Sequence, residues 1–221
     1  MPPSPNPSLN RLLQVAREAA TAAGNHALRN RARRNEVLRR FNHDIKLILD
    51  VECQRVAERR ILRHFPTHAI LGEEVTGSVR RQPPSSDYEW IIDPIDGTVN
   101  FSHGLPFWCC SIAVRRGSQV LAGVVYAPEL RECYSAVING PALCNGRPLR
   151  VSKTAKLSDA IVMTGIDRHA DKKRSSLVMF KAITDRIRRP RVVGVAAVDL
   201  CRVAAGQADA YFENDIYLWD V

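Results

Sequence analysis

The chain reads Trp90-Ile91-Ile92-Asp93-Pro94-Ile95-Asp96-Gly97-Thr98 where a short apolar run meets two closely spaced acids. Its first three residues have the character of a buried strand end, so Asp93 would be presented from a rigid element. Pro94 has a fixed φ and biases Asp93 away from helical conformation. We therefore expect a turn after Ile92 on which the two carboxylates converge.

These residues suit a divalent metal held against a phosphate. Mg²⁺ prefers hard oxygen ligands and keeps some of its waters, so Asp93 and Asp96 with the Ile95 carbonyl are suitable ligands. Gly97 and Thr98 follow at an expected helix start, where free N–H groups and the positive end of the helix dipole attract an anion. The same residues also suit an ordinary capped turn, because Asp, Gly and Thr are frequent in turns and at N-caps.

Acids follow apolar residues at two further places, in Gly72-Glu73-Glu74 and in Trp219-Asp220 near the end of the chain. With these motifs and the block from Trp90 to Phe101, the chain resembles the inositol monophosphatase family of Mg²⁺-dependent phosphomonoesterases. The resemblance runs from about Leu12 to the last residue. It departs from the family pattern at Val99, which replaces the second Thr of Gly-Thr-Thr-Asn-Phe.

The resemblance implies an α+β fold, a layered αβαβα sandwich of the inositol monophosphatase and fructose-1,6-bisphosphatase type. We expect a disordered tail over 1–7 and an N-terminal α+β subdomain over 8–150 that carries most metal ligands. A C-terminal α/β subdomain over 151–221 would carry substrate contacts and the last ligand. Family members continue for some tens of residues past Trp-Asp, so this subdomain is expected to be truncated at its C-terminus.

The resemblance also implies roles for individual residues, with two or three Mg²⁺ ions as cofactor. The catalytic residues would be Asp50, Glu73 and Thr98. The metal ligands would be Glu73, Asp93, the carbonyl of Ile95, Asp96 and Asp220. Phosphate would meet the amides of Gly97 and Thr98, and the rest of the substrate would meet Asp96, Gly194, Val195, Ala196, Glu213 and Asp220.

Two of these assignments carry further expectations. Asp50 would orient the Thr98 hydroxyl, although an acid at a helix start is also favoured by the dipole alone. The family's Asp-x-Val-Thr-x-x-Asp is here the stretch from Asp44 to Asp50, with Lys46-Leu47 in place of Val-Thr. Glu74 is expected to be a surface acid beside its ligating neighbour.

The expected substrate is a small polyol or sugar phosphate similar to inositol-1-phosphate. Relatives with the same metal motif hydrolyse inositol, fructose, histidinol or nucleotide phosphates, and the motif does not separate them. Val195 lacks the hydroxyl that the family has at this position. Glu213 matches the acid that accepts hydrogen bonds from substrate hydroxyls, although it could also be an ordinary acid at a strand edge.

Composition indicates a globular protein: of 221 residues, 45% are hydrophobic and 25% are charged. No apolar run approaches membrane-spanning length, and the Pro-rich start lacks the features of a signal peptide. The six cysteines show no Cys-x-x-Cys spacing, and the adjacent Cys109 and Cys110 would face opposite sides of a strand. We therefore expect reduced core cysteines, a cytoplasmic protein and no membrane partner.

The net charge of +9 is concentrated in two arginine-rich segments. The segments contain Arg29, Arg31, Arg33, Arg34, Arg39 and Arg40, and then Arg186, Arg188, Arg189 and Arg191. They could attract anionic substrate, form a solvated face, or let a protein of this fold bind RNA or a protein partner. RNA binding is the less favoured of these because no aromatic residues are interleaved. The six histidines have no zinc-ligand spacing, and a homodimer is expected from the resemblance alone.

Apolar spacing predicts helices over about 8–33, from Asp50 to before Pro66, over 175–188 and over 196–205. Strands are predicted at 70–71, 90–92, 108–114, 120–126, 132–137, 160–164, 192–193 and 210–212. Helices followed by an antiparallel meander and then by alternating elements indicate a layered α+β domain.

Overall fold

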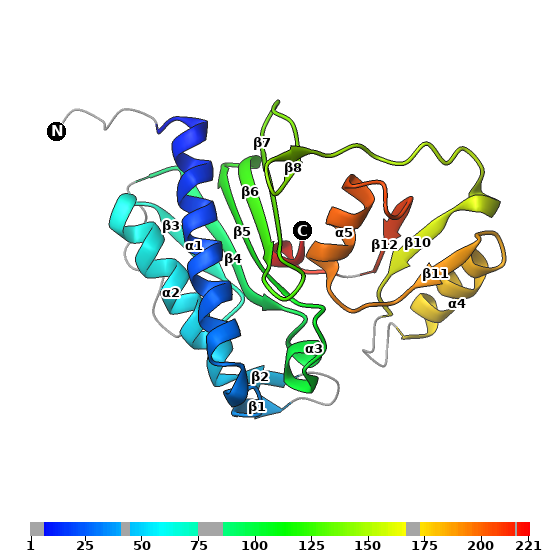
Figure 1. Cartoon of the computed structure of the whole chain (residues 1–221), viewed down its shortest axis with the longest axis horizontal. Coiled ribbons are helices and arrows are strands. Elements are labelled where there is room, and N and C mark those ends of the chain that lie inside the picture. The colour runs from blue at the N-terminus through cyan, green and yellow to red at the C-terminus, as the bar shows by residue number, and fades with distance from the viewer. Residues whose placement is uncertain (1–6, 41–44, 75–85, 167–172, 215) are drawn as a thin grey trace.

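The computed structural model describes residues 7–40, 45–74, 86–166, 173–214 and 216–221, with the side chains of 173–176 left aside. The predicted tail, apart from Pro7, and Asp44 lie outside these ranges. Two main sheets, a small two-stranded sheet, and the helices between and beside them build the molecule (Figure 1). The helices are α1 (Leu9–Arg29), α2 (Ile48–His64), α3 (Thr98–His103), α4 (Lys173–Thr184) and α5 (Ala196–Ala204), with single 3₁₀ turns η1 (Arg31–Arg33), η2 (Leu157–Asp159) and η3 (Leu218–Asp220).

The larger sheet has seven strands in the order β3-β4-β5-β6-β7-β8-β9. They are β3 (Ala69–Gly72), β4 (Tyr88–Asp96), β5 (Cys109–Arg116), β6 (Gln119–Ala127), β7 (Glu132–Val137), β8 (Leu143–Cys144) and β9 (Arg147–Pro148). β3 pairs parallel to β4, and all later neighbours pair antiparallel, as the predicted meander requires. A separate hairpin joins β1 (Val37–Arg40) to β2 (Ile45–Leu47).

α1 and α2 pack together over one face of this sheet (Figure 1). α1 begins where predicted, because the Ser8 side chain accepts a hydrogen bond from the Arg11 N–H and caps the first turn. It ends four residues earlier than expected, at Arg29, and the arginines beyond it form η1. The small and aliphatic residues of α1 form the main core together with α2. Trp90 and Ile92 of β4, and Trp108 just before β5, complete this core.

β4 does not stop in a turn after Ile92, so that expectation was wrong. The strand continues through Pro94 to Asp96 and contains a bulge, since Asp93 pairs with Ser111 while Asp96 pairs with Cys109. A bulge inserts an extra residue and bends the strand, and it tolerates a proline because the local ladder is interrupted. The bulge, rather than a turn, therefore directs the two carboxylates.

On its other side the large sheet meets α5, which also contacts the second sheet. This sheet has three parallel strands in the order β11-β10-β12, formed by Arg189–Arg191, Ile161–Thr164 and Ala210–Phe212. Figure 1 shows α4 beside β11 at the far edge. The layers run helices, large sheet, helix, small sheet, helix, which confirms the αβαβα sandwich. The division into 8–150 and 151–221 stays a prediction, although the large sheet ends at Pro148 and the small one begins at Ile161.

Two predicted elements near the arginine-rich segment 186–191 are misplaced. α4 ends at Thr184 rather than 188, because the chain then turns so that Arg188 and Arg189 donate backbone hydrogen bonds to the Ala160 carbonyl. The strand predicted at 192–193 lies instead at Arg189–Arg191. The apolar valines follow it, and the Val193 carbonyl accepts a hydrogen bond from the Asn100 side chain.

Cys109 and Cys110 face opposite sides of β5, as predicted. Cys110 belongs to the core beneath α1 and α2, whereas Cys109 packs with Val195 and Val198 on the α5 side. All six cysteines are free thiols. None of the helices in the described ranges is long and apolar enough to cross a membrane.

Truncating Leu12 tests the packing of α1 on the sheet. Its side chain is 0% exposed, so Leu12→Ala should lower the free energy of unfolding by about 2–5 kcal/mol through lost burial and an unfilled cavity. Urea denaturation measures this difference. Leu38→Ala is the matched control, because Leu38 is 58% exposed and its loss should change stability by no more than about 0.5 kcal/mol. Equal losses in both variants would contradict the packing described.

Candidate active site

One cavity of about 170 Å³ gathers most of the residues expected at the metal and phosphate site. Its lining consists of Glu73, Asp93, Ile95, Asp96, Gly97, Thr98, Val99, Gly194 and Asp220. These residues come from the carboxyl ends of β3 and β4, the start of α3, the approach to α5, and η3. Four segments of the chain, at Glu73, 93–99, Gly194 and Asp220, therefore meet at one edge of the large sheet.

The acids of β4 are buried and held by backbone N–H groups. Asp93 accepts a hydrogen bond from the Ile95 N–H at 3.1 Å, across the bulge. Asp96 accepts one from the Ala197 N–H at 2.8 Å, which ties β4 to the first turn of α5. The Cys109 thiol, 3.8 Å from the same Asp96 oxygen, is a weak second donor. Both carboxylates are thus oriented by the surrounding backbone.

Gly97 allows the chain to pass directly from β4 into α3. Its φ of +88° lies in the left-handed region, where glycine has no Cβ penalty. A Cβ there would lie 2.7 Å from Cγ2 of Val195 and 2.9 Å from the Phe107 carbonyl oxygen. The start of α3 can therefore approach the start of α5 closely only with glycine at this position. Thr98, the first helical residue, donates its hydroxyl proton to the Ile95 carbonyl at 2.9 Å.

Asp50 lies in the first turn of α2 and is almost fully buried. One carboxylate oxygen accepts the Leu47 N–H at 2.6 Å. The other oxygen, Oδ1, has no hydrogen-bond partner among the described residues. The expected Asp50–Thr98 hydrogen bond is not formed, because the Thr98 hydroxyl is directed to Ile95 instead. Asp50 nevertheless keeps a buried acceptor available.

Glu73 and Glu74 extend from the end of β3 in different environments. Glu73 donates its N–H to the Ile92 carbonyl, so it lies beside Asp93 at the parallel β3–β4 edge. Glu74 is not the surface acid that was expected. It is 5% exposed, pairs with Lys46 at 3.0 Å, and exchanges two backbone hydrogen bonds with the Gln54 side chain. Those bonds hold the β3 end against α2 and so position Glu73.

The residues expected to meet the rest of the substrate divide into two groups. Gly194 lines the cavity, and Ala196 begins α5 beside it. The Val195 side chain is buried against Gly97 and the α5-side core, so only its backbone can face a ligand. Glu213 lies outside the cavity lining and accepts a hydrogen bond from the Tyr211 hydroxyl.

Burial and mutual repulsion make these acids hard to ionise. Burial, with repulsion from Glu74, raises the pKa of Glu73 to about 7. Burial also raises the pKa of Asp96 to about 8, although the Ala197 N–H opposes the shift. The pKa of Asp93 lies well above its usual range because the residue is buried beside Glu73 and Asp96. A bound cation would remove this penalty.

The donor set fits a hard divalent cation by its chemistry. Carboxylate oxygens and one backbone carbonyl are the ligands that Mg²⁺ prefers. In the described part of the chain, however, no three Asp, Glu, His or Cys side chains already form a cluster ready to hold a metal. The Asp93 carboxylate accepts the Ile95 N–H, and the Asp220 carboxylate accepts the Tyr217 N–H at 2.7 Å. Each of these hydrogen bonds engages one carboxylate oxygen, so the second oxygen of Asp93 and of Asp220 could still ligate a cation.

Three supporting residues were not predicted as part of the site. Lys46 and Gln54 hold Glu74, and the Asn100 side chain donates to the carbonyls of Phe107 and Val193, both at 2.9 Å. Asn100 thereby links α3 to the loop that carries Gly194. The only sequence signal for Lys46 was its departure from the family's Val, and Gln54 gave none, since a polar residue inside a helix is common.

An acidic cavity beside a helix start, at the edge of an αβαβα sandwich, is suited to hold a cation against a phosphate group. A model of the inositol monophosphatase family matches residues 8–221. The chain belongs to the inositol monophosphatase family.

Relatives of this family are similar over nearly the whole chain. Inositol monophosphatase of Mesembryanthemum crystallinum is 31% identical over 98% of this chain and 81% of its own length. A protein named Nus factor SuhB, from Pseudomonas aeruginosa, is 36% identical over 95% of this chain and 79% of its own. Among solved structures, the extragenic suppressor protein suhB of Bartonella henselae is 30% identical with a TM-score of 0.88, covering 94% of this chain and 80% of the other.

The raised pKa of Asp96 predicts how stability depends on pH when metal is removed by EDTA. An unfolded Asp titrates near pH 4, so between about pH 4 and 8 the folded protein holds more protons than the unfolded one. The contribution of Asp96 is therefore present at low pH and is lost as pH rises towards 8.

Asp96→Asn should remove part of this dependence. The variant should melt at a higher temperature than the wild type at about pH 8 and at a similar temperature at about pH 4, as scanning calorimetry would measure. Asp185→Asn, at an exposed acid, is the control and should follow the wild type. A variant that melts lower than the wild type at both pH values would show that the Asp96 carboxylate is not penalised by its surroundings.

Proposed function

We propose that the protein is a Mg²⁺-dependent phosphomonoesterase that hydrolyses a small polyol or sugar phosphate, of the inositol-1-phosphate kind. The observation that carries this proposal is the single cavity in which Glu73, Asp93, Asp96 and Asp220 meet the start of α3. Membership of the inositol monophosphatase family supports phosphatase chemistry, and the family is generally metal-dependent.

In this proposal the acids would hold two or three ions, and Asp93 would serve as a ligand common to the positions. Glu73 and the Ile95 carbonyl would complete one position, and Asp96 and Asp220 another. Mg²⁺ supplies Lewis-acid stabilisation of the phosphoryl oxygens and activates water for in-line attack on phosphorus. The burial and repulsion that raise the pKa values of these acids also favour a bound cation, because a cation lets the carboxylates ionise while buried.

Residues of the chain would then hold the water and the phosphate. Glu73 and the Thr98 hydroxyl would orient the attacking water and accept its proton, with Asp50 behind Thr98. For this the Thr98 hydroxyl must leave Ile95, and the unpartnered Oδ1 of Asp50 is a buried acceptor suited to receive it. The amides of Gly97 and Thr98 would bind phosphate, because the first N–H groups of a helix have no partners within it.

The remainder of the substrate would lie towards α5. Gly194, the backbone of Val195 and Ala196 border this side, with Asp96 and Asp220 accepting hydrogen bonds from substrate hydroxyls. Glu213 would join them only if its pairing with the Tyr211 hydroxyl is exchanged. A homodimer and a cytoplasmic location remain predictions from the resemblance and composition.

A second function, binding of RNA or a protein partner through the arginine-rich segments, is supported by one comparison. A relative that is 36% identical carries the name Nus factor rather than that of a phosphatase. Several arginines of these segments already have acidic partners, as Arg33 has Glu36 and Glu52, and Arg188 has Asp159. The phosphatase proposal therefore leads.

The test is phosphate release from myo-inositol, fructose, histidinol and nucleotide phosphates, with and without Mg²⁺. Removing even a supporting partner of a metal ligand costs roughly 10- to 100-fold. Asp93→Asn, which alters the shared ligand itself, should therefore lower kcat/KM by at least about 100-fold. Asp185→Asn is the matched control and should keep wild-type turnover.

Turnover that needs no divalent cation, or that survives Asp93→Asn, would contradict the proposal. A folded protein with no turnover on any ester, together with salt-sensitive RNA binding that survives Asp93→Asn, would favour the second function instead.

A further inference from the structure

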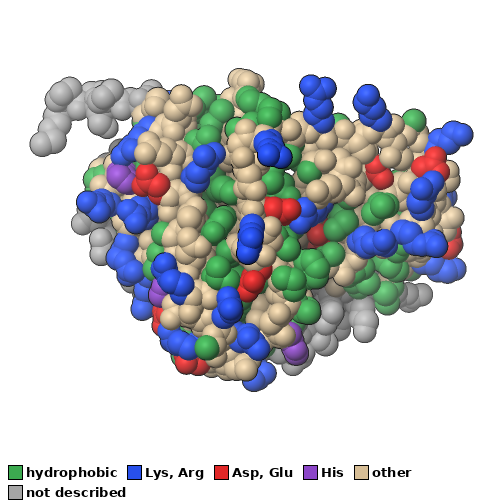
Figure 2. All heavy atoms as spheres, in the orientation of Figure 1, with side chains coloured by type: hydrophobic (Ala, Val, Ile, Leu, Met, Phe, Trp, Pro, Cys, Tyr) green, Lys and Arg blue, Asp and Glu red, His purple; other side chains and the backbone are tan. Residues whose placement is uncertain are grey.

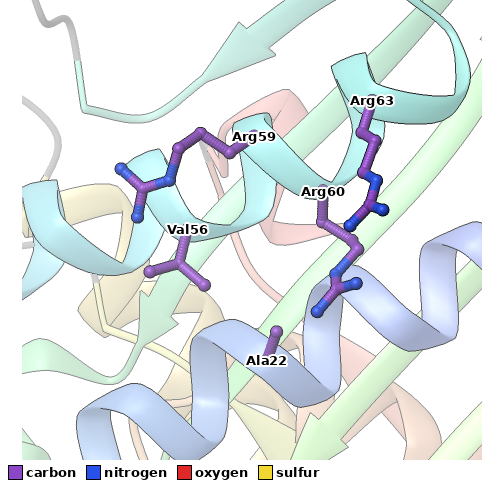
Figure 3. Close-up of a pocket in the computed structure, with 5 residues that line it drawn as sticks. All are labelled: Ala22, Val56, Arg59, Arg60 and Arg63. Carbon is purple, nitrogen blue, oxygen red and sulfur yellow. The ribbon is translucent and has the colours of Figure 1, made fainter.

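A groove outside the active site lies between α1 and α2. It has a volume of about 310 Å³ and is lined by Ala22, Val56, Arg59, Arg60 and Arg63 (Figure 3). α2 connects it to the active site but keeps the two apart, because Arg60 lies ten residues beyond Asp50, or about 15 Å along the helix axis. The groove takes no part in the chemistry proposed above.

The three arginines of the groove carry uncompensated charge. All three are exposed, and none has a hydrogen bond or ion pair with any residue of the described ranges. Arg63 is three residues from Arg60 and four from Arg59 along the helix, a spacing at which like charges repel. Figure 2 shows many Lys and Arg side chains, and few acids, along the edge occupied by α1 and α2.

The nearest acids on these two helices are already engaged. Glu58 is buried and accepts a hydrogen bond from Gln54. Glu52 pairs with Arg33 and His26, and Glu18 pairs with His64. None of the carboxylates on the described helices α1 and α2 forms an ion pair with the three arginines of the groove. An anion from solution would be favoured there.

The shape of the groove indicates which kind of anion would fit it. Val56 and Ala22 point towards one another from the two helices and form an apolar floor, and the Arg60 side chain reaches from α2 towards α1 (Figure 3). Guanidinium groups bind phosphate oxygens in a two-pronged manner and also stack on flat rings. A volume near 300 Å³ is at the lower end of small-molecule sites.

We propose that the groove between α1 and α2 binds a small organic polyphosphate, with two or more phosphate groups on Arg59, Arg60 and Arg63 and its organic part against Ala22 and Val56. Several separated guanidinium groups favour a ligand with more than one phosphate. No aromatic side chain lines the groove, so there is no platform on which successive bases of a nucleic acid could stack.

Isothermal titration calorimetry of the full chain in EDTA tests this site, with ADP and inorganic tripolyphosphate as probes. EDTA keeps the metal-dependent active site from binding phosphate. The wild type should bind ADP at one site per chain, more weakly as salt is raised. Arg60→Gln and Arg63→Gln should each weaken binding by at least about tenfold, because each removes a charged hydrogen-bond donor.

Arg55→Gln is the matched control, since Arg55 is an exposed arginine of the same helix that does not line the groove. This variant should bind within about twofold of the wild type, as should Asp93→Asn. Arg55, Arg60 and Arg63 are all exposed, so the three arginine variants should keep the wild-type melting temperature.

Three results would overturn the proposal. An equal loss in Arg55→Gln would show that only general charge attracts the probe. A loss in Asp93→Asn would place the probe in the active site. Binding of a short single-stranded RNA without binding of ADP or tripolyphosphate would assign the groove to nucleic acid. Because the assay needs no turnover, its outcome is independent of the proposed phosphatase function.

Discussion

The structure depends on holding several carboxylates together where water is scarce. Asp93 and Asp96 are buried and Glu73 is partly buried; burial raises the pKa of all three, and repulsion from Glu73 adds to the shift at both aspartates. Such a group is stable only when protons or cations neutralise it and when a stiff scaffold prevents the side chains from separating. The rest of the fold can be understood as that scaffold.

The scaffold is centred on β4. This strand lies between β3 and β5, so both of its edges are paired, and its bulge directs Asp93 and Asp96 without leaving the sheet. The two parts of the molecule are joined at the same place. The Ala197 N–H binds Asp96, Val195 packs on Gly97, and Asn100 holds the loop before α5. A ligand bound there would therefore lie between the end of β4 in the large sheet and the start of α5, which packs on the small sheet.

α2 carries two separate charged regions. Its first turn presents the buried Asp50, and its second half presents the exposed arginines of the groove. This distribution agrees with the helix dipole, which favours anions at the N-terminus and cations at the C-terminus. The dipole explains why such residues are tolerated. It does not explain why the arginines lack partners, and their position over an apolar floor is what gives the groove a binding character.

The sequence by itself determined the class of fold and the main helices and strands, because apolar periodicity is a local property. Its short acidic motifs, through the family resemblance, predicted the acids that line the cavity. It also placed Cys109 and Cys110 on opposite faces, since side chains alternate along a strand. Only the tertiary structure decided that β4 bulges rather than turns, that Glu74 is buried by Lys46 and Gln54, and that Thr98 bonds to Ile95. The arginine groove likewise exists only because α1 and α2 pack together, which brings Ala22 and Val56 into one lining. These features depend on contacts between residues far apart in the chain, whose geometry no local pattern contains.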